Sequence, residues 1–351
     1  MQRRHQGTYR ARYRRGGRSA ECAQSGVLIA NSADIRPTNI HARSLVLVRA
    51  GDSSLHLDWL AGAPREWDLA VSYFGDDAAE AFEAARYVHH YKGGKWDGIH
   101  AFFAAYPAVA LDYDYFWLPD DDIRANASTV NALFRAMTLH SIELAQPGLT
   151  LGSYFQHPST LANPNFKLRY ATMIEIMAPV LDRRLLNLLL PLFATTRSGF
   201  GLDYFWHRLT TDPATKAAIL DDISVTHTRP IGAQLAGMLR SAGTDPETER
   251  AEVTARVGVK TFHAIAFAGV LRDGRRVTSR IRCAFLQFFG LLWHFHKTRW
   301  NDVNSRGVLW KYMKLARYGL SQIRYRPELS ILSESDVQRS AHNGPPATPA
   351  D

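Results

Sequence analysis

The feature that most constrains the fold is a short apolar run that ends in acids, at residues 113–123 (YDYFWLPDDDI). Residues 115–118 have the composition of a strand buried on both faces. Pro119 ends this strand, because proline has no N–H to give to a ladder of hydrogen bonds. Three aspartates follow at the carboxyl end of the strand, which is where open α/β sheets hold their ligands. The stretch therefore favours an α/β fold with a site at this edge of the sheet.

The three acids at residues 120–122 predict a metal and phosphate site. Carboxylates this close repel one another, so they require full solvation or a counter-cation. Mn2+ or Mg2+ suits the position, because these ions take carboxylate oxygens and keep coordination positions for phosphate. We expect Asp120 and Asp122 to bind the metal, and Asp120 and Asp121 to contribute to cofactor binding. The alternative is a solvated acidic turn before a helix that Asn126 caps.

Strand and helix patterns alternate around this stretch, over about a hundred residues. Strands are predicted at 45–48, 67–74 and 115–118, and helices at 52–60, 78–88, 98–106 and 127–140. Asp97 is the expected cap of the third of these helices. The alternation indicates a mostly parallel, doubly wound sheet flanked by helices. No Gly-x-Gly-x-x-Gly follows the first strand, so a dinucleotide-binding site is not supported.

The second half of the chain is less regular. Residues 146–166 have the composition of loops with one or two short strands, and helices are predicted at 180–190, 204–209 and 231–260. A glycine-rich turn at 197–203 (RSGFGLD) presents Asp203. Residues 219–227 predict an acidic turn followed by a strand that ends at His227.

The charge of the chain is concentrated at its start. The formal net charge is +9, and residues 1–18 alone carry seven arginines and no acid. We expect residues 1–43 to be a disordered basic arm and residues 330–351 a disordered tail. The rest of the chain is then close to neutral, so the basic composition does not indicate a specific nucleic-acid partner.

A second basic region lies near the C-terminus. Residues 272–326 contain thirteen Lys and Arg against two acids, around an apolar block at 283–295. This block is interpreted as core, and the flanking cations leave a peripheral membrane contact open. No apolar run reaches the length of a membrane span, no secretory signal is apparent, and the two cysteines form no disulfide framework. A location in the cytoplasm, or on the inner face of the membrane, is expected.

Other polar residues lie beside the expected strand ends or in glycine turns. Because strand ends of a parallel sheet meet at one edge, Lys92, Lys95, Asp203 and His227 are expected to converge on the acids at 120–122. His227 would be the third metal ligand, the two lysines would bind phosphate, and Asp203 would face an acceptor as a base or positioning carboxylate. The alternatives are a structural histidine, solvated lysines and a helix-capping aspartate.

Five segments together are similar to one known family. They are KGGKW at 92–96, YFWLPDDDI at 115–123, QPGL at 146–149, GFGLD at 199–203 and the stretch from Asp221 to VTHTRP at 225–230. In this order they resemble the domain-of-unknown-function family numbered 707, over about residues 45–232. Phe200 and Gly148 depart mildly from the expected pattern, which has Trp and Ala there.

The resemblance implies a glycosyltransferase of the A-type nucleotide-diphospho-sugar fold. From the residue pattern we also expect a helical C-terminal extension packed on this domain. It implies that Asp120 and Asp122 form the Asp-x-Asp motif that binds metal and sugar nucleotide, with His227 as a further ligand and Asp203 on the acceptor side. We expect a transferase-like domain at 44–235 and a helical basic extension at 236–329. The expected reaction moves a sugar from a nucleoside-diphosphate sugar to a glycan or lipid-linked acceptor. Two other functions stay open: a metal-dependent phosphohydrolase, and a non-catalytic protein that binds glycans or anionic surfaces.

Overall fold

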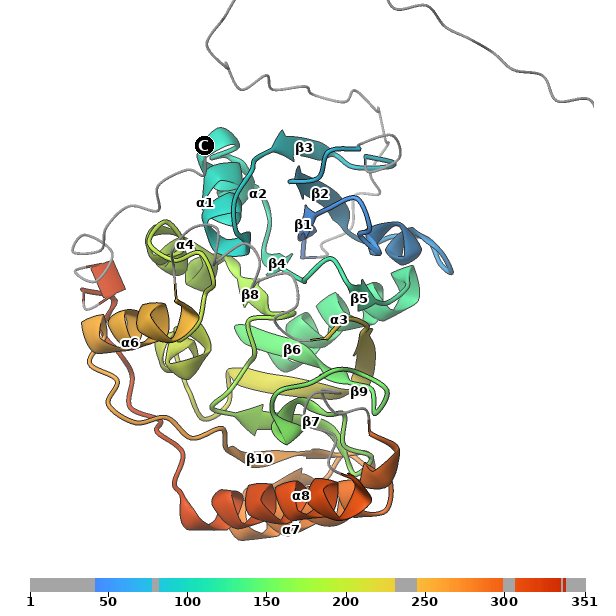
Figure 1. Cartoon of the computed structure of the whole chain (residues 1–351), viewed down its shortest axis with the longest axis vertical. Helices are drawn as coiled ribbons and strands as arrows, with labels where there is room; N and C mark the ends of the chain where they lie inside the picture. Colours follow the sequence, from blue (N-terminus) through green and yellow to red (C-terminus); the bar gives the residue numbers. More distant parts are fainter. Residues whose placement is uncertain (1–41, 78–81, 231–244, 299–306, 336, 339–351) are drawn as a thin grey trace, which may run out of the picture.

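A single mixed sheet organises the computed structural model of the chain, which describes residues 42–77, 82–230, 245–298, 307–335 and 337–338 (Figure 1). In these residues the strand order is β11-β10-β7-β9-β6-β8-β4-β1-β2-β3, and β5 pairs with β9 off this path. The strands are β1 (Ser44–Ala50), β2 (Asp68–Tyr73), β3 (Tyr87–His90), β4 (Tyr115–Trp117), β5 (Ile123–Arg124), β6 (Leu144–Leu149), β7 (Phe166–Ala171), β8 (Val180–Asp182), β9 (Ala217–His227), β10 (Ala266–Leu271) and β11 (Arg276–Val277).

Helices cover both faces of this sheet. The α-helices are α1 (Lys95–Ala105), α2 (Val109–Asp112), α3 (Ala127–His140), α4 (Arg183–Phe193), α6 (Pro246–Arg256), α7 (Arg280–Leu292) and α8 (Gly307–Arg324). Short 3-10 turns are η1 (His56–Leu60), η2 (Pro158–Thr160), η3 (Leu202–Tyr204), η4 (Trp206–Leu209) and η5 (Phe295–Lys297). Alternate residues of β1 enter the two cores: Leu45 and Leu47 join the cluster that includes α1 and α4, and Val46 and Val48 join the cluster that includes α3. A strand buried on both faces reads as a continuous apolar run.

The pairing confirms the predicted α/β fold with a mostly parallel sheet and a helical C-terminal element. β3, β2, β1 and β4 are mutually parallel, and β6 is parallel to β9. Following the ladders along the path, seven strands run in one direction, and β8, β7 and β11 run in the other. No helix in the described part of the chain is long and apolar enough to cross a membrane.

Several elements match their predicted positions. α3 covers the predicted residues, and Asn126 caps it by accepting a hydrogen bond from Thr129 N at 3.0 Å. β1, β2 and β4 lie at the predicted strands. The helix expected at 98–106 begins earlier, at Lys95, and Asp97 lies inside its first turn instead of capping it.

Other predictions were wrong in part. The helix expected over 78–88 runs into the strand β3, because residues 87–90 pair in parallel with β2. This pairing overrides the helical preference of the nearby alanines. Residues 78–81 lie outside the described residues. The helix expected at 180–190 starts as the strand β8, and Asp182 then caps α4 by accepting from Leu185 N. The helix expected at 204–209 is a pair of 3-10 turns. Residues 146–166 were expected to be loops with one or two short strands, and the end of β6 agrees with this expectation.

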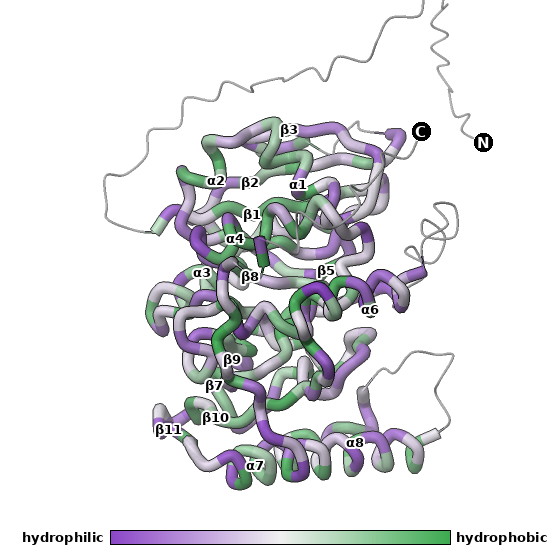
Figure 2. Tube along the Cα trace, turned by 90° about the vertical axis from the view of Figure 1, so that its left-hand side faces the viewer, coloured by the Kyte–Doolittle hydropathy of each residue, from purple (hydrophilic) through white to green (hydrophobic). Residues whose placement is uncertain are grey.

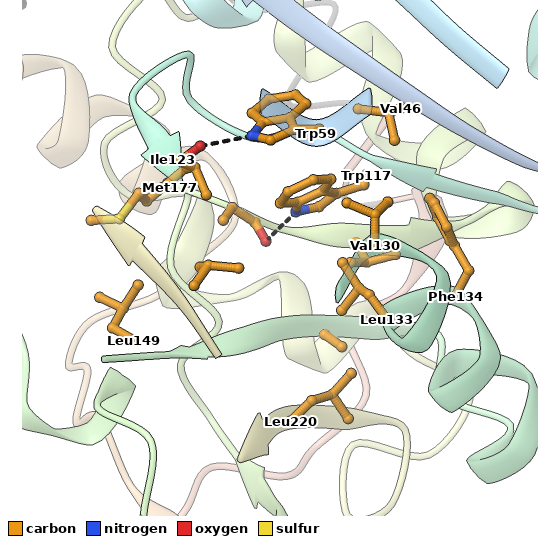
Figure 3. Close-up of a cluster of buried hydrophobic side chains, with 14 of the residues drawn as sticks. Val46, Trp59, Trp117, Ile123, Val130, Leu133, Phe134, Leu149, Met177 and Leu220 are labelled. Carbon is orange, nitrogen blue, oxygen red and sulfur yellow. Dashed lines mark hydrogen bonds between the residues drawn. The ribbon is translucent and has the colours of Figure 1, made fainter. Parts of the chain in front are cut away.

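Two tryptophans fix the loop that carries the acids (Figure 3). The indole N–H of Trp59, in η1, donates to Ile123 O at 2.8 Å, and that of Trp117, in β4, donates to Ala178 O at 3.2 Å. The two indoles pack together with centroids 5.1 Å apart, and both are fully buried. The residues just before and just after the three aspartates are therefore tied to the core.

The C-terminal region is more than a helical extension. β10 pairs with β7 and β11 pairs with β10, so the sheet continues across the boundary predicted at residue 235. The helix predicted over 231–260 is found as α6, and residues 231–244 lie outside the described residues. Of the predicted C-terminal tail, Leu332 N donates to Arg208 O and Val337 is fully buried, so this part packs on the fold.

A buried ion pair joins β7 to β9 and is hydrogen-bonded to the C-terminal helix α7. Arg169 and Asp221 have fully buried side chains, and the guanidinium donates to both carboxylate oxygens, at 2.7 and 2.8 Å. Its Nη1 donates to Gln287 Oε1 of α7 at 3.0 Å, and that oxygen also accepts from Tyr318 of α8 at 2.8 Å. The guanidinium therefore links β7, β9 and α7 directly, and α8 joins them through Gln287.

Arg169→Met is expected to lower the free energy of unfolding by about 3–5 kcal/mol, because it leaves the Asp221 carboxylate buried without its counter-charge. Urea unfolding measures the change. Lys167→Met, on the same strand but only partly buried, is the matched control and is expected to change stability by less than about 0.5 kcal/mol. A loss in Arg169→Met no larger than in the control would contradict the assignment.

Candidate functional site

The predicted site lies where the strand order of the sheet changes direction. From β1 the chain moves outward through β2 to β3, and β4 then lies on the other side of β1. In open α/β sheets, ligands bind outside the carboxyl ends of the strands at such a switch point. A cavity of about 420 Å³ is found here. The predicted site residues in its lining are Lys95, Asp120, Asp121, Asp122, Asp203 and His227.

The structure brings the two outer aspartates and the histidine together. One ligand atom from each of Asp120, Asp122 and His227 lies within 4.8 Å of the others. The short pairing of β5 with β9 is responsible, because it aligns Ile123 with His227. Thr228 strengthens this junction, since its N and Oγ1 both donate to Asp122 O, at 3.2 and 2.8 Å.

The hydrogen bonds of this group leave its ligand atoms suited to a cation. His227 Nδ1 is 2.9 Å from Tyr154 O, and Nε2 is 3.1 Å from Asp122 Oδ2. A carbonyl on Nδ1 is the kind of contact that orients a metal-binding imidazole through its other nitrogen. Within the described residues, Asp122 Oδ1 is buried without a hydrogen-bond partner. Two carboxylates and an imidazole fit Mn2+, and the carboxylates alone fit Mg2+.

The pKa of His227 also indicates a site that favours a cation. Burial lowers the pKa of an imidazole, but the hydrogen bond to Asp122 and the charges of Asp122 and Asp120 outweigh it and raise the pKa of His227 to about 8. At neutral pH the imidazole is therefore protonated on both nitrogens and positively charged, next to these acids. A bound divalent cation would take the place of that proton.

Lys95 and Asp121 hold the group in place. Lys95, the first residue of α1, donates from Nζ to Asp120 Oδ1 at 2.6 Å and to the carbonyls of Ile176 and Met177. Asp121 accepts from Gly51 N and from Arg229, each at 3.0 Å, so it ties the end of β1 to the residues that follow β9. Burial raises the pKa of Asp121 despite these contacts. Both side chains line the cavity as predicted, and their contacts with a ligand remain predictions.

Lys92 is not part of the group. Its ammonium donates to Phe74 O at 2.7 Å, to Gly75 O at 2.8 Å and to Asp76 Oδ1 at 2.6 Å. The ion pair with Asp76 is exposed, and Lys92 is absent from the cavity lining. The structure therefore does not bring Lys92 to the acids, and its proposed contact with phosphate has no geometric support.

Asp203 lies in the same cavity beside a second carboxyl group that the sequence did not predict. Burial, and then the charge of Glu175, raise the pKa of Asp203 to about 8. Burial also raises the pKa of Glu175 to about 7, with Asp120 adding to the shift and His227 and Lys95 opposing it. Glu175 N donates to Gln146 Oε1 at 2.5 Å, and its Oε2 is buried without a hydrogen-bond partner in the described residues. The cavity thus holds two carboxyl groups that titrate near neutral pH.

The turn that presents Asp203 is held by a residue of α6. Gly199 and Gly201 have φ of +73° and +95°, which L side chains rarely adopt. Glu249 accepts from Ser198 N at 3.1 Å and from Gly199 N at 3.2 Å, and also from the Thr196 hydroxyl. The sequence predicted the turn correctly, but Glu249 is separated from it by about fifty residues and gave no signal.

A buried arginine supports another part of the cavity lining. Arg49, near the end of β1, donates to the carbonyls of Tyr91, Gly93 and Gly94 and to the Ser72 side chain. Burial lowers its pKa to about 10, against the opposing charges of Asp97, Tyr91 and Asp121. Arg49 therefore fixes the glycine turn before α1, and with it the start of the helix that carries Lys95. Nothing in the strand pattern of residues 45–48 marked this role.

Glu175→Gln is expected to change the pH dependence of stability. The carboxyl group ionises with a pKa of 4.5 in the free residue and about 7 in the fold. A raised pKa means that the folded state disfavours ionisation, so this group costs stability increasingly as pH rises from about 4.5 to 7. The Glu175→Gln variant should therefore have a free energy of unfolding about 1–3 kcal/mol higher than the natural chain above pH 7. Near pH 4 the two should be equally stable. Melting temperatures across this range measure the difference.

The exposed Glu83→Gln serves as the control, with no expected pH-dependent difference. A gap between Glu175→Gln and the natural chain that is constant with pH, or that grows toward acid, would contradict the burial of an ionisable group here.

Comparisons with known proteins give distant likenesses. No family model and no curated protein matches the chain. Among solved structures, TarS of S. aureus, residues 1–349 in complex with UDP-GlcNAc, matches with a TM-score of 0.42 at 12% identity, covering 86% of this chain and 89% of that one. The UDP complex matches with a TM-score of 0.37 at 11% identity and the same coverage. A longer TarS structure matches with a TM-score of 0.39 at 12% identity, and the match covers 60% of this chain and 40% of the TarS chain.

Proposed function

We propose that the chain is a metal-dependent glycosyltransferase that moves a sugar from a nucleoside-diphosphate sugar to an acceptor hydroxyl. The observation that carries the proposal is the Asp120, Asp122 and His227 group, which lines one cavity together with Asp203. A site for a divalent cation at the switch point of an α/β sheet suits a diphosphate. Asp203, a carboxyl group in the same cavity but outside this group of three residues, is suited to accept the proton of the attacking hydroxyl.

Asp120, Asp122 and His227 would hold Mn2+ or Mg2+. When bound there, the ion supplies charge neutralisation for the diphosphate that leaves the sugar. Lys95 adds a cation at the same end of the cavity, where Nζ lies 2.6 Å from Asp120 Oδ1. Asp121 and Arg229 hold the loop rigid through their 3.0 Å contact, so the ligand atoms keep their positions as charge develops.

Asp203 would take the proton of the acceptor hydroxyl. As the new bond forms between the acceptor oxygen and the anomeric carbon, the bond from that carbon to the diphosphate oxygen breaks, and the proton moves to the carboxylate. Burial raises the pKa of Asp203 to about 8, close to the pH at which a general base is most effective. A perturbed carboxyl group in a cleft is a site candidate on physical grounds. A glycan or lipid-linked acceptor and a cytoplasmic location stay predictions.

A thermal-shift screen tests the proposal. Uridine, guanosine, cytidine and thymidine diphosphate sugars are added one at a time, with and without Mn2+, to the whole chain. At least one is expected to raise the melting temperature, and only with the metal present, because a ligand that binds the folded state stabilises it by mass action. Stabilisation by none of them would overturn the proposal. Release of nucleoside diphosphate at the same rate with and without an acceptor would indicate a hydrolase instead.

A further inference from the structure

Two helices cap the end of the sheet at β10 and form a layer of their own. α7 packs on β10, and α8 packs on α7. Their buried positions meet through Gln287, which accepts from Tyr318 at 2.8 Å, and through Gly319, which lies against Phe288. In Figures 1 and 2 the two helices lie together at the end of the molecule opposite β2 and β3. Each helix thus has one face occupied by the fold.

The face of α7 turned away from the fold is also apolar. Ile281, Phe285, Phe289 and Trp293 are exposed, Trp293 to 80%. They follow one another at intervals of four residues, which places them along one side of the helix. Phe285 and Phe289 stack with centroids 6.3 Å apart. Exposed large apolar side chains scattered singly need no explanation, but a continuous stripe does.

α8 repeats this pattern. Leu309, Met313, Leu320 and Ile323 are exposed and lie on one side of the helix by their spacing, with Leu309 exposed to 75%. The same helix buries Leu315 and Tyr318 on its other side. Both helices are therefore apolar on an inner and on an outer face, although only the inner face has a partner in the described residues.

The charges around these stripes have one sign. Residues 279–298 and 307–327 contain eight Lys and Arg and no Asp or Glu. Arg282, Lys297, Arg317 and Arg324 are among the exposed ones. Two copies of such a face would bring like charges together, whereas an anionic surface would neutralise them. Helices that are apolar on one side and cationic at their flanks lie in the plane of a lipid interface.

We infer that the outer face of α7 and α8 binds the surface of an anionic lipid bilayer. The aromatic and aliphatic stripe enters the boundary between headgroups and acyl chains, and the arginines and lysines contact the anionic headgroups. The inference stands apart from sugar transfer, since it uses none of the cavity residues.

Vesicle co-sedimentation of the whole chain tests the inference, without donor or metal. The probes are vesicles of phosphatidylcholine alone and vesicles that also contain phosphatidylglycerol. The chain is expected to bind the anionic vesicles preferentially, and less as salt is raised. Phe285→Ser with Trp293→Ser is expected to weaken binding at least about tenfold. Arg282→Glu with Arg317→Glu is expected to weaken it about fivefold for each charge removed.

Leu111→Ser with Leu139→Ser is the matched control, because these two leucines are also exposed, to 66% and 77%, but lie on other helices. This variant is expected to bind like the natural chain. If both test variants kept the vesicle binding of the natural chain, the inference would be overturned, and the binding would be attributed to the arginines of residues 1–18. A natural chain that binds no vesicles but self-associates would also overturn the inference. If Phe285→Ser with Trp293→Ser abolished that self-association, the occupant of the face would be a second copy of the chain.

Discussion

Asp122→Asn is expected to abolish metal-dependent donor binding and to lower turnover by about a thousandfold or more. The substitution keeps the shape of the side chain but removes one negative charge and one strong oxygen ligand from the three-residue group. Neutralisation of the leaving diphosphate by a metal contributes several kcal/mol to the transition state, and each 1.4 kcal/mol is about a factor of ten in rate. Calorimetric titration with Mn2+, followed by a donor titration, measures both losses.

The control for this variant is Asp76→Asn. Asp76 is also an acid at the end of a parallel strand, but it is exposed and pairs with Lys92. It is expected to leave Mn2+ affinity and turnover within about twofold of the natural chain. If Asp122→Asn bound Mn2+ as tightly as Asp76→Asn does, the three-residue group would not be the metal site.

Asp203→Asn is expected to lower turnover by about 10²–10⁴-fold while donor binding stays unchanged, because the lost group acts on the acceptor proton. If the proposed function is right, the turnover of the natural chain should also depend on pH. Asp203 must be ionised to accept a proton, and its pKa is about 8, so turnover should rise as pH approaches 8 and then level off. The variant should lose this rise. Initial rates at saturating donor and acceptor, measured across pH, give both results.

Asp58→Asn, an exposed aspartate on η1, is the control and should keep both the rate and its pH dependence. Loss of donor binding in Asp203→Asn would move this residue to the donor side. A rate within tenfold of the natural chain would remove it from the chemistry.

Patterns set by neighbouring residues were predicted well. Asn126 and the helix after it were found at the predicted positions, because a cap and a helical apolar period are both local. The meeting of His227 with the acids was also predicted, because the carboxyl ends of parallel strands share one edge whatever the loops between them do.

What the sequence missed depends on packing between distant segments. Glu175 follows β7 in a stretch without periodicity, and only its burial among other charges marks it. Lys92 and Lys95 have the same local composition, but a glycine turn separates them, so that one side chain faces β2 and the other faces Asp120. Composition cannot distinguish the two sides of a turn. In the same way, pairing with β2 decided that residues 87–90 form a strand.

The place of β10 beside β7 sets a lower limit on how far the chain can be shortened. Cutting it after α6 would leave β7 as an open edge, with a row of unsatisfied amides and carbonyls ready to pair with another molecule. The same cut would strip Arg169 of its contact with Gln287 and admit water to a charge that is now fully enclosed. A chain shortened in this way is therefore expected to aggregate, even though it retains Asp120, Asp122 and His227.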